Sequence, residues 1–394
     1  MIKLGSISKQ IRGITYSKSV AKSEPTDGFK AILRAGNIGA SRVIGTDYIF
    51  VPENLIKKEQ YLKYGDILIA ASSGSLSVVG KAAMLETNMD ASFGAFCKVL
   101  RPNFDVINPR FFRFYFETRS YKNTIMHLAE GANINNLKSE HFNNLEIPLP
   151  SKPEQQKIAR ILDAADDLRQ KDQQLVDHYT ALGQALFIEM FGDPTTNPMN
   201  WEQVTLSSTC NKITDGTHQS PKFINEGIPF LFVSNIVDNQ INFKTHKFIS
   251  LLDYQQLTKN TPIEIGDVLL TSVGSYGNPA IVEDDTLFCF QRHIAHIKPN
   301  ASKVNSLFLR EMLKSQFAKN QFDRLAIGVA QKTLNLKVIK SLELINPPLS
   351  LQNQFAERIT LIEAQKKQAQ ASLALSQSLF DSLLHRAFTG ALTA

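Results

Sequence analysis

The side chains best suited to chemistry or recognition gather in short segments rich in serine, asparagine and glycine. Two of these segments, 70–75 and 271–278, each follow an apolar run that begins with Gly-Asp. Small hydrogen-bonding residues let a backbone approach phosphates or base edges closely, so both segments are candidate contacts to DNA, although they could equally be plain surface loops. The candidate residues are Ser72, Ser73, Ser75, Ser272, Ser275, Tyr276 and Asn278.

Six further side chains carry donors and acceptors that pair with base edges in the major groove of DNA. Arginine and lysine suit the acceptors of guanine, whereas asparagine and glutamine suit the edge of adenine. A lone arginine is more often simply solvated, so the prediction is that some loop in each half of the chain contacts DNA. The six candidates are Arg34, Asn37, Lys81, Asn235, Gln291 and Arg292.

Motifs that would indicate catalysis are incomplete, and the sequence predicts no catalytic residue. The segment 346–349 reads Asn-Pro-Pro-Leu and resembles the Asn-Pro-Pro-aromatic motif of amino-methyltransferases, but Leu349 cannot stack on a flipped base. Its prolines suit the start of a helix instead. The segment 74–82 imitates a phosphate-binding loop, but the spacing of its glycines is wrong and Ala82 replaces the required serine or threonine.

No metal site or disulfide is predicted. His293 and His296 stand three residues apart in an extended segment with no third ligand nearby, so ordinary polar or core roles are expected. The three cysteines, Cys97, Cys210 and Cys289, are far apart and form no CxxC pair. This pattern indicates buried free thiols.

The chain of 394 residues is 43% hydrophobic and 20% charged, which is typical of a folded protein with more than one domain. Its net charge of +6 favours an anionic partner such as DNA. The positive excess lies outside two segments, 151–194 and 348–394. No apolar run is long enough to span a membrane and no signal peptide is recognisable, so a cytoplasmic location without a membrane partner is expected.

The second half of the chain repeats the first at a constant offset of 197 residues, as Gln155 and Gln352 illustrate. Upstream the offset drifts by a few residues, as between Asp66 and Asp267. Both aspartates occupy turn positions, where a capping role is expected. Other matches at the constant offset are Arg101 with Lys298, Ile158 with Phe355 and Phe191 with Phe388.

Each repeat divides into a globular module and a long helix. In the modules, short apolar runs punctuated by Gly, Asn, Asp and Ser predict strands and turns. Helices are expected at 109–122 and at about 304–322. The predicted boundaries are 1–150 and 195–347 for the modules, and 151–194 and 348–394 for the helical segments.

Apolar residues at alternating spacings of three and four, interrupted by Asp172, predict a long helix from Glu154 onward. About 37 residues at 1.5 Å each span roughly 55 Å. The two long helices could bury their stripes against each other, or each could dock on its own module. The predicted stripes are Ile158, Ile161, Ala165, Leu168, Leu175, Tyr179, Leu182 and Leu186, and in the second copy Ile359, Ile362, Ala369, Leu373, Phe380 and Leu383.

The order of module, Pro-rich segment, Glu-Gln-x-x-Ile-Ala helix, second module and second helix resembles the specificity subunit of type I restriction-modification enzymes. The resemblance covers the whole chain. Its most specific pieces are the segments 149–159 and 186–192, the Gly-Asp-Ile-Leu strand at 65–68 and the Trp-Glu pair at 201–202.

The resemblance implies an α+β fold with two α/β target recognition domains, joined by two long helices that form an antiparallel coiled-coil pair with a pseudo-twofold internal repeat. Each domain would read one half of a bipartite, asymmetric site on double-stranded DNA. The chain would recruit two modification (methyltransferase) subunits and the restriction (translocase and endonuclease) subunits. S-adenosylmethionine, ATP and magnesium would be bound by those partners, and no cofactor is expected in this chain.

Two other functions remain open from the residues alone. The chain could be an enzyme with its own methyltransferase or nuclease activity, in which case the purified chain would transfer methyl groups by itself. It could also be a scaffold whose helices bind proteins without reading DNA, and such a scaffold would give no sequence-selective shift in a salt-controlled binding assay.

Overall fold

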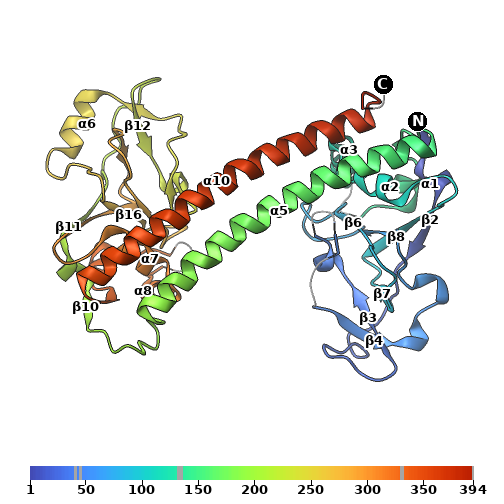
Figure 1. Ribbon diagram of the computed structural model, residues 1–394, viewed down its shortest axis with the longest axis horizontal. Coiled ribbons are helices and arrows are strands. Elements are labelled where there is room, and N and C mark those ends of the chain that lie inside the picture. The colour runs from blue at the N-terminus through green and yellow to red at the C-terminus, as the bar shows by residue number, and fades with distance from the viewer. Residues whose placement is uncertain (40–41, 44–46, 131–135, 329–331, 393–394) are drawn as a thin grey trace. The chain divides into compact units, whose positions relative to one another are not determined.

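The computed structural model describes residues 1–39, 42–43, 47–130, 136–328 and 332–392. The chain forms two compact units (Figure 1). Unit 1 comprises residues 1–174 and 370–394, and unit 2 comprises residues 175–369. Each unit therefore combines one globular module with helical segments from both sequence repeats. The boundaries predicted from the sequence separate the globular modules from the long helices. They are a different division from these two units, and they stay a prediction.

The described residues of unit 1 form three small sheets. Its strands are β1 (Ile2–Lys3), β2 (Ser8–Arg12), β3 (Phe29–Leu33), β4 (Ile49–Pro52), β5 (Ile67–Ala70), β6 (Ala82–Met84), β7 (Ala91–Phe93), β8 (Cys97–Pro102) and β9 (Glu146–Ile147). The largest sheet is antiparallel with the order β2-β8-β5-β6, and β5 is buried along its whole length. The second has the order β4-β3-β7 with β3 parallel to β7, and β1 pairs with β9.

Unit 2 repeats these sheets strand for strand. Its strands are β10 (Gln203–Thr205), β11 (Cys210–Asp215), β12 (Ile228–Leu231), β13 (Ile236–Val237), β14 (Gln240–Ile241), β15 (Phe248–Ile249), β16 (Val268–Thr271), β17 (Pro279–Ile281), β18 (Cys289–Phe290), β19 (Ile294–Pro299) and β20 (Glu343–Ile345). The orders β11-β19-β16-β17 and β15-β12-β18 match those of unit 1, and β12 is again parallel to its third partner, β18. The hairpin β13-β14 is additional.

Most, but not all, of the shorter helices also correspond between the units. The α-helices are α1 (Leu4–Ile7), α2 (Pro109–Tyr115), α3 (Arg119–Glu130) and α4 (Ser139–Asn143) in unit 1, and α6 (Leu251–Thr258), α7 (Ser306–Lys314), α8 (Gln316–Leu325) and α9 (Leu336–Lys340) in unit 2. The 3-10 helices are η1 (Ala35–Asn37), η2 (Glu53–Leu55), η3 (Lys58–Gln60), η4 (Leu206–Thr209) and η5 (Val233–Asn235).

The single helices expected at 109–122 and 304–322 are each two helices, which corrects the sequence prediction. In unit 2 the break falls at Ser315, whose hydroxyl accepts a hydrogen bond from the Ala318 backbone N–H at 3.2 Å. In unit 1 the Thr118 hydroxyl accepts a hydrogen bond from the Tyr121 backbone N–H in the same way. Serine and threonine cap helix starts in this way, so a new helix begins where the periodicity alone predicted continuation.

The long helices are α5 (Lys152–Phe191) and α10 (Leu349–Phe388), of 40 residues each. Helix α5 begins two residues earlier than predicted, because Pro153 is tolerated in the first turn, where its missing N–H has no intrahelical partner to lose. The Glu154 carboxylate accepts hydrogen bonds from the backbone N–H and the hydroxyl of Ser151, at 2.9 and 2.6 Å. The start of α5 is thereby capped.

Three of the eight residues in the apolar stripe predicted on α5 are exposed, so the prediction is wrong at these positions. Leu168, Leu175 and Leu182 are between 40% and 46% exposed. The positions one residue further along are more enclosed: Arg169 and Val176 are half-buried, and Gly183 is buried against Ile359. The leucines at 168, 175 and 182 are spaced seven residues apart, and glycine is not scored as apolar. The prediction therefore assigned the exposed face of the helix to the core. On α10, by contrast, every predicted stripe residue is buried or half-buried.

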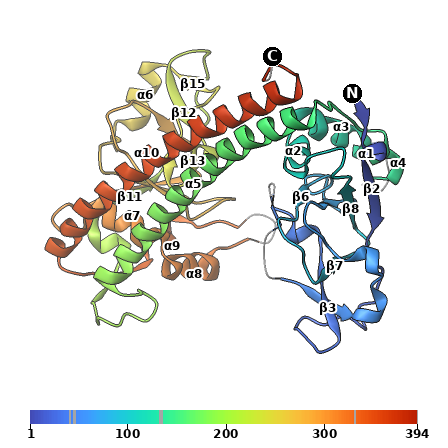
Figure 2. The ribbon, with the colours of Figure 1, turned by 45° about the vertical axis from the view of Figure 1, so that its right-hand side comes forward.

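Inside each unit a segment of α5 runs alongside a segment of α10 (Figures 1 and 2). In unit 1, Leu162 and Phe380 belong to one hydrophobic cluster, which also contains residues of α2 and α3. In unit 2, Phe187 contacts Phe355, with ring centroids 5.7 Å apart. The core of each unit therefore joins its sheet-bearing part to both long helices.

Candidate nucleic-acid interface

A buried glutamine lies at an equivalent position in each unit, Gln155 in unit 1 and Gln352 in unit 2. It links the sheet-bearing part of the unit to a long helix. The Oε1 atom of Gln155 accepts a hydrogen bond from the Asn108 backbone N–H at 2.7 Å, and its Nε2 donates to the Pro150 carbonyl at 2.9 Å. Gln352 accepts from the N–H of Asn305 at 2.9 Å and donates to a proline carbonyl at 2.8 Å in the same way. The constant sequence offset thus marks a shared anchor.

Gln155→Leu is expected to lower the free energy of unfolding by roughly 2–4 kcal/mol, because it leaves a buried N–H and a buried carbonyl without partners. Gln352→Leu should have a similar effect. Urea unfolding measures both changes. The matched control is Gln156→Leu on the exposed neighbour, for which less than about 0.5 kcal/mol is expected. Equal effects at positions 155 and 156 would contradict the anchor.

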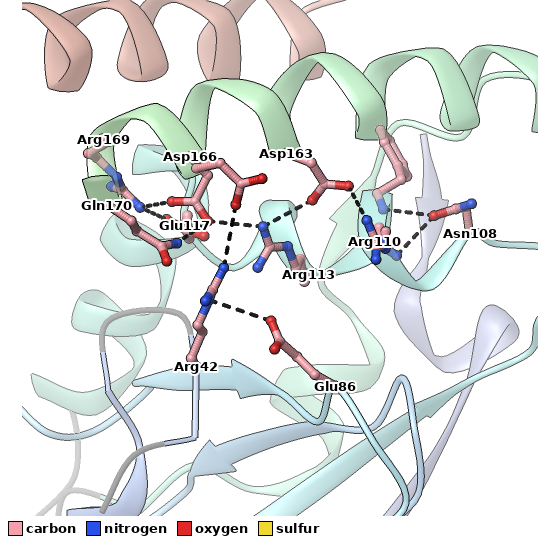
Figure 3. Close-up of polar contacts among 12 residues, drawn as sticks. Arg42, Glu86, Asn108, Arg110, Arg113, Glu117, Asp163, Asp166, Arg169 and Gln170 are labelled. Atoms are coloured by element: carbon pink, nitrogen blue, oxygen red, sulfur yellow. Dashed lines mark hydrogen bonds and ion pairs between the residues drawn. The ribbon is translucent and has the colours of Figure 1, made fainter. Parts of the chain in front are cut away.

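A network of ion pairs reinforces the anchor in unit 1 (Figure 3). The buried Arg113 guanidinium on α2 lies 3.1 Å from the Asp163 carboxylate and 3.0 Å from that of Asp166, both on α5. Asp166 also accepts hydrogen bonds from Arg169 and Gln170. Burial by itself would raise the pKa of Asp166, but Arg169 and then Arg113 hold it below its usual value.

Unit 2 has an equivalent ion pair between an arginine on a short helix and a carboxylate on a long helix, but the residues around this pair differ. Arg310, at the position of Arg113, is buried and bonded to Glu311 and to Glu363 on α10. Lys314 takes the place of Glu117 and pairs with Glu311 at 2.7 Å. An arginine on the short helix and a carboxylate on the long helix are therefore common to both units.

Glu117 should make unit 1 less stable as pH rises, because burial raises its pKa to about 7 and Arg169, 3.5 Å away, only partly offsets this. The folded chain holds this proton more tightly than the unfolded chain, so the free energy of unfolding should fall as pH rises from about 4.5 to about 7. We expect Glu117→Gln to remove that fall and to stabilise the chain at pH 8 by on the order of 2 kcal/mol.

Urea unfolding of the wild type and of Glu117→Gln at pH 5 and pH 8 measures this effect. The control is Lys314→Gln at the matching position of unit 2, which should change stability by the same amount at both pH values. A Glu117→Gln effect that did not depend on pH would show that the carboxyl titrates outside this range.

Three segments meet at one edge of unit 1, beyond the ends of β5 and β7. The Phe96 carbonyl accepts hydrogen bonds from the backbone N–H groups of Ala71 and Ser72, at 2.9 and 3.0 Å, and the Leu137 N–H donates to the Ala71 carbonyl at 2.8 Å. The segments, which we call the unit 1 loop edge, are 71–81, 94–96 and 136–137.

Unit 2 has the same arrangement. The Ser272 N–H donates to the His293 carbonyl at 2.9 Å, and the Leu334 N–H donates to the Ser272 carbonyl at 2.8 Å. We call the segments 272–278, 291–293 and 332–334 the unit 2 loop edge. Two of the three backbone hydrogen bonds at the unit 1 loop edge therefore have counterparts at the unit 2 loop edge.

The predicted residues of unit 1 lie mainly on the first segment of its loop edge. Ser75 and Lys81 are exposed, and Ser72 and Ser73 are half-buried. The Ser73 hydroxyl accepts from the Ser75 N–H at 3.2 Å. Arg34 lies next to the edge, since the preceding residue, Leu33, accepts a hydrogen bond from the N–H of Gly94. These positions could reach a ligand that meets the edge.

The predicted residues of unit 2 behave similarly, except that Ser272 is buried. Ser275 and Arg292 are exposed, and Gln291 is half-buried. Two others are half-buried and engaged inside the unit: the Tyr276 hydroxyl donates to Asp323 at 2.7 Å, and the Asn278 amide donates to the Ser275 carbonyl at 2.9 Å.

Asn37 and Asn235 serve the fold. Both are buried, and their Oδ1 atoms accept from the backbone N–H groups of Arg34 and Phe232, at 2.8 and 2.9 Å. Their amide groups donate to backbone carbonyls of the following loop, Asp47 in the case of Asn37. The recurrence of asparagine in both copies thus reflects a shared turn, and we leave both residues out of the proposed contact surface. Arg34 itself pairs with Asp47 at 2.9 Å.

A hollow of about 450 Å³ opens at the unit 2 loop edge. It lies where segments 272–278 and 291–293 meet the start of α9. Its lining residues are Asp215, Ser272, Val273, Arg292, His293, Thr333, Leu334, Asn335 and Leu336. A second hollow of similar volume lies in unit 1 beside β2, where it is lined by Lys9, Arg12, Lys57 and their neighbours.

Two residues of the loop edges, Phe96 and His293, are not among the DNA contacts predicted from the sequence. They are a matched pair at the constant offset, each just before the strand β8 or β19. Phe96 is 71% exposed, which is unusual for phenylalanine. The offset could have identified the pair, but apolar scoring assigns Phe96 to a core.

Other sequence predictions are settled by contacts within the units. Asp66 and Asp267 cap their turns as expected, accepting from backbone N–H groups at 2.8 and 2.9 Å. Each also pairs with a cation of the neighbouring strand, Arg101 or Lys298. His296 has the predicted core role, since it is buried and 2.6 Å from Asp267.

The remaining motifs have structural roles. The carbonyl of Pro347 accepts the Gln352 bond at the start of α10, so the prolines form a helix start as predicted. Cys97 and Cys289 are buried free thiols, and Cys210 is a half-buried one. Among the described residues no cluster of three or more His, Cys, Asp or Glu could hold a metal ion. No helix in the described ranges is long and apolar enough to cross a membrane.

Comparison with known proteins finds matches over both repeats. The family model described as type I restriction modification DNA specificity domain matches residues 1–176 and again residues 198–373. The StySPI specificity subunit of Salmonella potsdam is 31% identical over 414 residues, covering 99% of this chain and 88% of that protein. The EcoKI specificity subunit of Escherichia coli K12 is 30% identical, with the same coverage.

The fold also matches a solved structure. The crystal structure of the S subunit of a type I restriction-modification system from M. genitalium aligns with a TM-score of 0.60 and 16% identity. The alignment covers 98% of this chain and 95% of that one. At this identity the match speaks for the fold, which is a mixture of helices and strands in two repeated parts.

Proposed function

Because the chain belongs to the family of type I restriction-modification DNA specificity subunits, we propose that its two loop edges read the two halves of a bipartite, asymmetric DNA site. The chain supplies sequence recognition within a type I restriction-modification complex. Each loop edge holds its side chains on the same backbone framework, while the side chains themselves differ between the units. Such a pair of surfaces suits two different half-sites.

The observation that carries the proposal is this combination of shared framework and diverged surface. Backbone hydrogen bonds, anchor glutamines and buried arginines recur in both units, whereas turn 94–96 reads Gly-Ala-Phe and turn 291–293 reads Gln-Arg-His. Selection for stability alone does not require the exposed turns to differ between the units while the residues that support them stay alike. The recognition of different bases by the two units does require this difference.

The proposal extends to geometry and partners. We place α5 and α10 in one antiparallel coiled-coil pair with a pseudo-twofold relation between the repeats, so that helix length sets the unread spacer of the site. Two modification subunits would methylate adenine with S-adenosylmethionine, and restriction subunits would use ATP and magnesium. The chain itself would be non-catalytic and act in the cytoplasm.

The test is to express the full chain with the modification subunits of its own system in a host that lacks adenine methylation, and to map methylated adenines. The expected result is one two-part motif with an unspecified spacer. The purified complex should bind that motif selectively, with an affinity that falls steeply as salt rises.

Two outcomes would contradict the proposal. Methyl transfer from radiolabelled S-adenosylmethionine by the purified chain alone would indicate an enzyme with its own activity. Methylation without any sequence motif, by a complex that assembles normally, would indicate a protein-binding scaffold that does not read DNA.

A further inference from the structure

Turns 94–96 and 291–293 are packed closely against neighbouring backbone. Each joins the last strand of one sheet to the central strand of the other, β7 to β8 and β18 to β19. A glycine lies against each turn: a Cβ on Gly13 would come within 2.1 Å of the Gly94 carbonyl oxygen, and one on Gly216 within 2.4 Å of the Gln291 carbonyl oxygen. Rigid supports of this kind favour precise placement of side chains.

The hollow at the unit 2 loop edge brings together groups that suit one base pair. Arg292 is exposed at its rim and can donate two hydrogen bonds to the acceptors of guanine. Asp215 lines the same hollow, and its carboxylate lies 3.1 Å from the Nε2 atom of His218. A carboxylate oxygen can also accept a hydrogen bond from the amino group of cytosine. Burial and the charge of Arg292 lower the pKa of His293, which favours the neutral imidazole, a form that can both donate and accept.

The matching positions of unit 1 carry different chemistry. Ala95 and Phe96 replace Arg292 and His293, and Phe96 presents an exposed apolar ring where unit 2 presents charge. Apolar side chains contact the methyl group of thymine in the major groove. An exposed phenylalanine on a rigid turn has no role in the core of the unit.

We infer that these two turns carry the specificity-determining side chains of the chain: Arg292, with Asp215, reads a G·C pair in one half-site, and Phe96 reads a thymine in the other. This inference rests on the proposed function, because it names the residues by which the two loop edges would distinguish bases.

The experiment uses the full chain with its modification subunits and compares the methylation motifs of variants with that of the wild type. Arg292→Ala should relax one G·C position in one half of the motif, with the preference falling by about 5- to 140-fold on substituted duplexes. Phe96→Ala should relax a T·A position in the other half only. Both variants should still assemble with the modification subunits on size-exclusion chromatography.

Matched controls separate base reading from general effects. Lys259→Ala removes an exposed cation of unit 2 that does not line the hollow, and Phe104→Ala removes another exposed phenylalanine of unit 1, 46% exposed. Neither should change the motif, although loss of a phosphate contact could lower the rate at all sites alike.

The outcomes distinguish this inference from the proposed function. A wild type without a two-part motif would overturn the function itself. A wild type with such a motif that both variants reproduce would overturn only the inference. Loss of methylation at every site by an assembled Arg292→Ala complex would also overturn it, because a residue that reads one base pair should leave the other half-site in use.

Discussion

Replacing residues 1–150 with the corresponding segment of a relative that recognises a different sequence will change one half of the methylated motif and leave the other half unchanged. All segments of the unit 1 loop edge lie within 1–150, and all segments of the unit 2 loop edge lie within 195–347. Because each mismatched base pair costs about 1–3 kcal/mol, the original half-site should lose recognition entirely.

The chimera needs a donor that fits the anchor. Asn108 and Arg113 lie inside the exchanged segment, whereas their partners Gln155 and Asp166 lie outside it. The donor should therefore carry asparagine and arginine at the matching positions. Methylated-adenine mapping reports the new motif, and the reciprocal exchange of 195–347 should change the opposite half. A chimera in which both halves changed would show that the two units do not read independently.

Arg113→Ala is expected to destabilise unit 1 by about 3–5 kcal/mol. The substitution leaves the fully buried Asp166 without one of its two cations and removes the only link from α2 to that carboxylate that the described residues provide. Removing one partner of a buried pair costs more than the pair contributes, because the other charge stays desolvated. Arg310→Ala should have an effect of the same size in unit 2.

Arg110→Ala is the matched control. Arg110 bonds to Asp163 from the same helix at 2.9 Å, but it is 59% exposed, so its removal should cost less than about 1 kcal/mol. Hydrogen exchange of β5 and β16 in each variant reports the stability of the two units separately. Similar losses for Arg110→Ala and Arg113→Ala would mean that burial of the pair does not matter.

The constant offset was the most informative signal in the sequence, and it identified the supports better than the contact surface. It matched Gln155 with Gln352, which the structure confirms as equivalent anchors. It also matched Asn37 with Asn235 approximately, and both side chains hold a turn by accepting backbone hydrogen bonds, while their DNA contacts stay a prediction. Residues that are alike in both repeats are expected to support the fold, because the recognition of two different half-sites requires base-contacting residues that differ.

Tertiary context decided what periodicity could not. Leu168, Leu175 and Leu182 have the spacing of a buried stripe, yet the buried face includes Arg169, whose guanidinium lies 4.2 Å from the centre of the Phe380 ring. A cation on an aromatic face is invisible to a count of apolar residues. The offset pairs Phe96 with His293, but a count of apolar residues assigns the phenylalanine ring to a core, so its exposure is not predicted from the sequence.

The division of the long helices between the units also sets the order in which the chain can be completed during synthesis. Unit 2 is continuous, from residue 175 to 369, whereas unit 1 needs residues 370–394. At 5–20 residues per second, the ribosome finishes Phe380 and Leu384 roughly 10–50 s after residue 150. We therefore expect unit 1, which is begun first, to complete its apolar core only after residues 370–394 have been made.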